Sequence, residues 1–186
     1  TEQILTYFNQ GVSYPFVSRD QLVKQIPAMR KRFLKYESYS NARIGDILSG
    51  EQQQSSDRKL VYRLQSSYFE NTDGKFAVKD LPVEAQFFPV YSFCTTDVNS
   101  DGHLDLMAVG NLHATQPDFG RYDAGYGLVL TGDGKGNFST VKPSFSGFLV
   151  EGEGRNIQVI GTTNTRKIYL VSRNNQSVIG FHLLEK

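Results

Sequence analysis

Apolar residues in the first part of the chain recur with the spacing of an α-helix. They lie at intervals of four, three and four: Leu22, Ile26, Met29 and Phe33. Ser18 and Gln21 precede them in the Ser-x-x-Gln pattern of a capping box, which marks a helix N-terminus. Because Pro27 lacks a backbone N–H and clashes with the preceding turn, we expect two short helices, or a kink near Ile26.

The helical pattern gives way to an alternating one at about residue 60. A further short helix is predicted from Asn41, acting as its N-cap, through Leu48, with Gly50 ending it. The polar, Ser- and Gln-rich residues 51–59 are typical of a loop. Apolar and polar residues then alternate over 60–64, which predicts a half-buried strand. We therefore expect a helical lead-in or insertion at 1–59 and a β-rich part at 60–186.

Two short segments rich in Asp, Asn and Gly predict β-hairpins. Residues 71–74 precede an apolar segment at 75–78, and residues 133–136 separate expected strands at 127–130 and 137–139. A second repetition relates residues 95–97 and a strand at 104–109 to residues 162–164 and a strand at 168–171. Each unit then runs strand, loop, strand, hairpin, strand, which is the order of one propeller blade.

These units predict a mainly β fold with two to three propeller-type antiparallel blades and a small N-terminal helical segment. Closed propellers have about four to eight blades. We therefore expect the 186 residues to be part of a larger β-propeller, or else to cover their open blade edges with the helical segment or with another copy of the chain. The chain opens at Thr1 without an initiator Met, which fits the expectation of a fragment or processed product.

Composition narrows the classes of partner. The chain has 20 Lys and Arg residues against 19 Asp and Glu, and the net charge of +1 argues against a nucleic acid or an anionic membrane surface. No apolar run reaches the roughly 18 residues of a membrane-spanning helix, so no span is expected. Cys94 is the only cysteine, which excludes an intrachain disulfide.

Residues 97–105, the acidic loop, carry oxygen side chains at regular spacing. Positions 1, 3, 5 and 9 of the loop are Asp97, Asn99, Asp101 and Asp105. Gly102 at position 6 permits a sharp turn, and His103 at position 7 offers its backbone carbonyl. Calcium takes six to eight oxygen ligands and magnesium prefers retained waters, so this set predicts a structural calcium ion. The alternative is an Asp/Asn/Gly turn that binds nothing.

The acidic loop is no EF-hand, because Ala108 stands where the bidentate Glu belongs and the flanks are strand-like. The pattern Asp97-x-Asn99-x-Asp101-Gly102-x-x-Asp105-Leu106 resembles the FG-GAP/VCBS repeat of integrin-α-like β-propellers. Residues 130–138 are similar to that family's inter-blade element, and the resemblance covers about residues 60–150. It implies calcium at the acidic loop, an extracytoplasmic (secreted or cell-envelope) location and a binding or scaffolding role. Residues 164–167 replace the acids in the later unit, so no metal is expected there.

Enzyme chemistry finds little support in the sequence. His103 lies inside the acidic loop, His182 lies on an expected terminal strand, and His113 has no fixed spacing to a partner acid. Cys94 lies in an apolar run, which suits a buried inert thiol. We expect no catalytic residues. A propeller-scaffold enzyme acting on polysaccharide and a basic-helix protein-interaction module, docking an acidic partner through residues 24–35, remain the alternatives.

Residues 111–127, the insertion, are longer than a hairpin between two strands requires. Long loops on a rigid sheet often form binding surfaces. Asp118, Arg121 and Tyr122 are therefore candidate contacts for a carbohydrate or protein ligand. The alternative is an Ω-loop that covers an exposed sheet edge.

Overall fold

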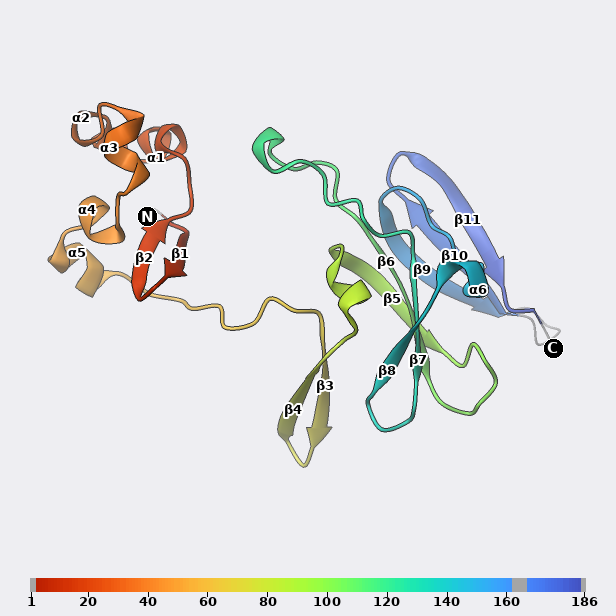
Figure 1. The fold of residues 1–186 in the computed structure, drawn as a ribbon. Helices are drawn as coiled ribbons and strands as arrows, with labels where there is room; N and C mark the ends of the chain where they lie inside the picture. The colour runs from red at the N-terminus through yellow and green to blue at the C-terminus, as the bar shows by residue number, and fades with distance from the viewer. Residues whose placement is uncertain (1–2, 162–166, 185–186) are drawn as a thin grey trace. The chain divides into compact units, whose positions relative to one another are not determined.

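The computed structural model describes residues 3–161 and 167–184. The chain divides into two compact units, unit 1 over Thr1–Val61 and unit 2 over Tyr62–Lys186. Figure 1 shows small helices in the first and antiparallel strands throughout the second. The fold is therefore mainly β, with helices confined to short segments.

Unit 1 is a strand hairpin followed by short helices. Its elements are β1 (Thr6–Asn9), β2 (Val12–Pro15), α1 (Arg19–Gln25), α2 (Met29–Arg32), α3 (Tyr36–Ser40), α4 (Ile44–Ile47) and α5 (Gly50–Ser55). Leu22, Phe33, Ala42 and Ile47 form its buried core. The predicted helical spacing thus places two of its residues, Leu22 and Phe33, in this core.

The predicted start and break of the first helix are confirmed. The Ser18 hydroxyl accepts from the Gln21 backbone N–H at 3.4 Å, and the Gln21 side chain accepts from the Ser18 N–H at 2.9 Å. α1 has Ile26 as its C-cap, just before Pro27, and α2 begins at Met29. The missing proline N–H separates the two helices as expected.

The predicted helix from Asn41 to Leu48 needs correction at both ends. Asn41 is the C-cap of α3, and α4 begins after Arg43, whose backbone N–H donates to the Asp46 carboxylate at 2.8 Å. Gly50 starts α5 instead of ending a helix, so part of the expected loop is helical. Ser49 and Gln52 form a second capping box there, and its two local hydrogen bonds outweigh the low helix propensity of glycine.

Unit 2 consists of antiparallel sheets whose strands follow one another in sequence. Its strands are β3 (Ser67–Thr72), β4 (Lys75–Asp80), β5 (Val90–Thr96), β6 (Asp105–Gly110), β7 (Leu128–Gly132), β8 (Phe138–Val141), β9 (Gly154–Gly161), β10 (Lys167–Arg173) and β11 (Gln176–His182). Short helical turns lie between them: η1 (Val83–Gln86), η2 (Pro117–Phe119) and α6 (Pro143–Ser146). The sheets have the orders β3-β4, β5-β6-β7-β8 and β11-β10-β9.

Both hairpins predicted from turn residues are confirmed. Residues 73 and 74 connect β3 to β4, and the turn after Gly132 connects β7 to β8. Among the described residues the strands form four small sheets, counting β1-β2, and close into no barrel or propeller. The number of blades stays a prediction. Of the residues expected to lack a metal, 164–166 lie outside the described residues.

The strand predicted over Leu60–Leu64 is wrong. This segment has no regular structure, and the first strand of unit 2 begins only at Ser67. Tyr62 and Leu64 are 89% and 90% exposed. Alternation of apolar and polar residues yields a stable strand only where a neighbouring strand accepts its backbone hydrogen bonds, and this connecting segment has no such pairing among the described strands.

The central strands of the sheet β5-β6-β7-β8, β6 and β7, are buried on both faces. Met107, Val109 and Val129 pack on one face against Ile157, Tyr169 and Val171 of the neighbouring sheet. Ala108, Leu128 and Leu130 pack on the other face against Ala85 and Phe88. A sheet covered on both sides is rigid, so the loops that leave its strands start from fixed points. No helix in the described part of the chain is long and apolar enough to cross a membrane.

Candidate metal centre

The acidic loop leaves and rejoins the four-stranded sheet at one paired position. Thr96, the last residue of β5, lies opposite Asp105, the first residue of β6. The chain reverses between them with Ser100 at φ 63° and Gly102 at φ 85°, both in the left-handed region. Glycine adopts this conformation without a steric penalty, which explains its place at the sharpest part of the loop.

Asp97 organises the first half of the loop. One carboxylate oxygen, Oδ1, accepts hydrogen bonds from the backbone N–H groups of Ser100 at 2.7 Å and Asp101 at 3.2 Å. The other, Oδ2, accepts from the Gly102 N–H at 2.9 Å. The backbone therefore wraps around this carboxylate and brings positions 4 to 6 of the loop close to it.

Asn99 and Asp101 lie side by side in the same turn. The Asn99 amide donates to Asp101 Oδ2 at 2.8 Å, and its Oδ1 accepts from the Asp101 backbone N–H at 3.0 Å. Asp101 Oδ1 accepts from the His103 N–H at 2.8 Å. This backbone hydrogen bond from His103, together with the bond from Asn99, lowers the pKa of Asp101, so its carboxylate is ionised near neutral pH.

Asp105 has a second role that its place in the motif does not reveal. Its side chain is fully buried. Oδ2 accepts from the Val98 N–H and Oδ1 accepts from the Gly132 N–H, both at 2.8 Å. The carboxylate therefore ties the acidic loop to the end of β7. Sequence reasoning assigned it only as a ligand, because Gly132 is distant in the chain.

A second polar turn, residues 133–137, borders the acidic loop. Asp133 Oδ1 accepts from the N–H groups of Lys135 at 2.8 Å and Asn137 at 3.0 Å, and the Asn137 amide donates to Oδ2 at 2.6 Å. These bonds, that from the Asn137 side chain above all, lower the pKa of Asp133 to about 2. The His103 ring lies so close that a Cβ added at Gly134 would be 2.6 Å from its Nδ1.

The two turns enclose one open polar hollow of about 370 Å³. Its lining residues come from both turns and from β7 and β8: Asn99, Asp101, His103, Thr131, Gly132, Asp133, Asn137 and Ser139. The sequence predicted residues 133–136 as a hairpin turn within an inter-blade element, with no part in a metal site. The signal for its second role was the repeated Asp-Gly pair, which also occurs at 101–102.

The donor set of the acidic loop fits calcium in its chemistry. Three carboxylates and one amide oxygen are hard ligands of the kind that calcium takes. Within residues 3–161 and 167–184, no group of three or more His, Cys, Asp or Glu side chains is already gathered as a metal cage. The loop oxygens instead accept backbone N–H groups. An oxygen that accepts a single hydrogen bond retains a lone pair for a cation.

The candidate ligand residues of the insertion are exposed. Asp118 lies in η2, and Arg121 and Tyr122 follow it on the returning limb. The two limbs are joined where Leu112 and Tyr122 exchange backbone hydrogen bonds of 2.8 and 2.9 Å. Asp118 and Arg121 therefore lie in the loop beyond this bridge, and Tyr122 lies in the bridge itself.

A buried polar network holds the base of the insertion. The Asn111 amide donates to the carbonyls of Gly125 at 2.6 Å and Gly152 at 2.8 Å. Glu153, also buried, accepts from the His113 N–H and the Asn174 amide at 2.8 and 2.7 Å. These two bonds, with the His113 backbone contributing most, lower the pKa of Glu153. The insertion thus grows from a fixed base.

The sulfur of Cys94 faces the core of unit 2. It packs against the cluster that contains Met107 and Val109. Burial raises the pKa of its thiol, which keeps it protonated and weakly nucleophilic.

Comparison of the chain with protein-family models, with curated proteins and with solved structures finds no match. The resemblance to FG-GAP/VCBS repeats therefore stays a prediction from the sequence of the acidic loop and of residues 130–138.

Proposed function

We propose that unit 2 is a calcium-stabilised β-sheet segment of the propeller-blade type, with a recognition or scaffolding role in a secreted or cell-envelope protein. The observation that carries this proposal is the acidic loop. Asp97, Asn99 and Asp101 lie in one hydrogen-bonded turn, and Asp105 fixes that turn to β7. Calcium would be held by these four side chains and the His103 carbonyl.

The physical reason for calcium is charge. Carboxylates that are close together repel one another, and a divalent cation among the three within these nine residues would offset that repulsion. The loop joins β5 to β6, so tightening it also stabilises the sheet from which the insertion grows. Calcium would therefore act on stability, with no chemical step at the metal.

The sheet order supports the blade interpretation. β5, β6, β7 and β8 are each hydrogen-bonded to the next in sequence, which is the up-and-down arrangement of a propeller blade. The central strands β6 and β7 have apolar neighbours on both faces, as central blade strands have in a propeller. The secreted or envelope location comes from the resemblance alone.

The recognition role is proposed for Asp118, Arg121 and Tyr122. These exposed side chains of one loop suit a sugar or a polar peptide, since the Tyr122 ring offers a flat apolar face and the charged groups of Asp118 and Arg121 accept or donate hydrogen bonds. Glycans and envelope proteins screened against the full chain should yield a ligand whose binding falls at least about tenfold in Arg121→Ala. An equal affinity in this variant would exclude the insertion as the contact surface.

Isothermal titration of the full chain with calcium chloride tests the metal site. We expect one site per chain, weaker binding of magnesium, and loss of the calcium signal in Asp101→Ala. Asp118→Ala removes an equally exposed acid outside the loop and should bind calcium as the parent does. No heat in the parent chain, or equal binding in Asp101→Ala, would contradict the proposal.

A further inference from the structure

Unit 1 carries a basic surface that the proposed function of unit 2 does not use. Residues 21–36 include five Lys or Arg residues and no Asp or Glu. Arg30, Lys31, Arg32 and Lys35 are all exposed, and none of the four forms an ion pair with another described residue. Unit 1 as a whole has nine basic and six acidic residues. Its positive charge is therefore concentrated around α2 and the turn that follows it.

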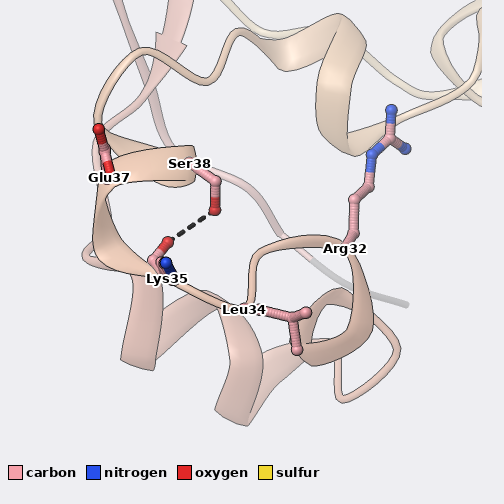
Figure 2. A pocket seen from close by; sticks show the side chains of 5 residues that line it. All are labelled: Arg32, Leu34, Lys35, Glu37 and Ser38. Carbon is pink, nitrogen blue, oxygen red and sulfur yellow. Dashed lines mark hydrogen bonds between the residues drawn. The ribbon is translucent and has the colours of Figure 1, made fainter.

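This surface contains an open hollow of about 360 Å³, here called the basic hollow. Arg32, Leu34, Lys35, Glu37 and Ser38 line it. In Figure 2, Leu34 lies between Arg32 on one side and Lys35, Ser38 and Glu37 on the other. Leu34 is 75% exposed, whereas its neighbour Phe33 is buried in the core of unit 1. The hollow thus combines an accessible apolar side chain with two cations.

The backbone of the basic hollow is fixed by side chains. Arg19 donates to the carbonyls of Phe33 at 2.6 Å and Leu34 at 3.2 Å. The Ser38 hydroxyl donates to the Lys35 carbonyl at 2.7 Å, as the dashed line in Figure 2 marks. Three consecutive carbonyls are therefore occupied by hydrogen bonds. A surface held in this way loses little conformational entropy when a ligand binds.

A further contact, through the side chain of Tyr36, holds the turn that follows α2. The Tyr36 hydroxyl donates to Asp20 at 2.6 Å, and the Arg19 guanidinium lies 5.1 Å from the centre of the Tyr36 ring. Arg19 and Asp20 are thus engaged with each other and with the turn. The charges of Arg30, Lys31, Arg32 and Lys35 stay available for a partner.

We propose that the basic hollow binds an acidic peptide segment of a protein partner, with one apolar side chain of that segment resting on Leu34. The carboxylates of the segment would lie near Arg32 and Lys35, where their charges are complementary. Glu37, which also lines the hollow, repels an acid placed beside it. The acidic residues of the bound peptide should therefore lie along Arg32 and α2. Nucleic acid fits less well, because no aromatic ring lines the hollow to stack on a base.

Fluorescence anisotropy with the full chain tests this proposal. The probe is a short fluorescein-labelled peptide of Asp and Glu residues around one central Leu, measured at low and at physiological salt. We expect saturable binding that weakens with salt. The double variant Arg32→Glu/Lys35→Glu should weaken it at least about tenfold, and Leu34→Ala several-fold.

Two matched controls separate this site from general charge and from calcium. Arg58→Glu/Lys59→Glu reverses two exposed cations of the same unit outside the hollow and should change binding by less than about twofold. Asp101→Ala should leave peptide binding unchanged, so failure of the calcium proposal and failure of this one are distinguishable. Circular dichroism of each variant confirms that unit 1 is folded.

Three outcomes would overturn the proposal. One is the absence of saturable binding to the acidic peptide, and another is equal binding by the Arg32→Glu/Lys35→Glu variant. The third is tighter binding of a single-stranded oligonucleotide or of phosphatidylserine vesicles that depends on the same two cations, because the ligand would then be a phosphate polymer or a lipid surface.

Discussion

Asp105 shows how one carboxylate can belong to a fold and to a candidate metal site at the same time. Two backbone N–H groups, from Val98 and Gly132, depend on it, and it is fully buried. Its place in the acidic motif predicts a ligand, but its bond to Gly132 could not be predicted, because the two residues are brought together only by the pairing of β6 with β7.

Asp105→Ala should lower the free energy of unfolding of unit 2 by about 3 kcal/mol in calcium-free buffer, because the buried Gly132 N–H and the part-buried Val98 N–H lose their acceptor. Urea denaturation measures this change. Asp118→Ala removes an exposed acid and should stay within about 0.5 kcal/mol of the parent. A loss in Asp105→Ala no larger than in Asp118→Ala would show that the carboxylate does not hold the loop.

Asp133 gives the turn at 133–137 a dependence on pH. Its pKa is about 2 in the folded chain against an ordinary 3.8. A lowered pKa stabilises the fold where the carboxylate is ionised, so the contribution is complete above about pH 4 and is lost as the pH falls toward 2. Thermal unfolding measured between pH 5 and 2 tests this contribution. The unfolding temperature of Asp133→Asn should fall less steeply with decreasing pH than that of the parent chain. Carboxyl titration by NMR checks the pKa directly, and a value near 3.8 would contradict the structure.

At the scale of elements, the sequence predicted correctly those helices and hairpins whose hydrogen bonds join residues a few positions apart. The Ser18 capping box, the break at Pro27 and the two hairpins were all predicted, because their residues act within a few positions. The strand at 60–64 failed because pairing is not local. The helix α5 was missed because its capping box, Ser49 with Gln52, lies in a segment without apolar periodicity.

Glu153 holds the base of the insertion by accepting the His113 N–H. Glu153→Gln removes the charged acceptor of the His113 N–H and should weaken the bridge between Leu112 and Tyr122. Hydrogen exchange of the Leu112 and Tyr122 amides should become about tenfold faster, which corresponds to about 1.4 kcal/mol. Glu151→Gln, an exposed position two residues away, is the matched control. Unchanged exchange in Glu153→Gln would mean that the network does not hold the loop.

At the scale of the whole molecule, the chain has two units with opposite charge. Unit 1 has three more basic than acidic residues, and unit 2 has two more acidic than basic ones. The mainly β character followed from turn residues and alternation. The packing of one sheet of unit 2 against another could not be predicted, because it depends on apolar contacts between distant strands, such as those of Val109 and Tyr169.

Calorimetric unfolding of the full chain, with calcium and with EDTA, tests the central claim most directly. At about 100 times its dissociation constant, calcium should raise the transition of unit 2 by roughly 10 °C and leave that of unit 1 in place. Asp101→Asn should lose most of this shift, whereas Asp73→Asn, which also changes an acid directly before a glycine, should keep it. The acidic loop is not a calcium site if calcium leaves the unfolding temperature of unit 2 in the parent chain unchanged, or if it raises that temperature equally in Asp101→Asn.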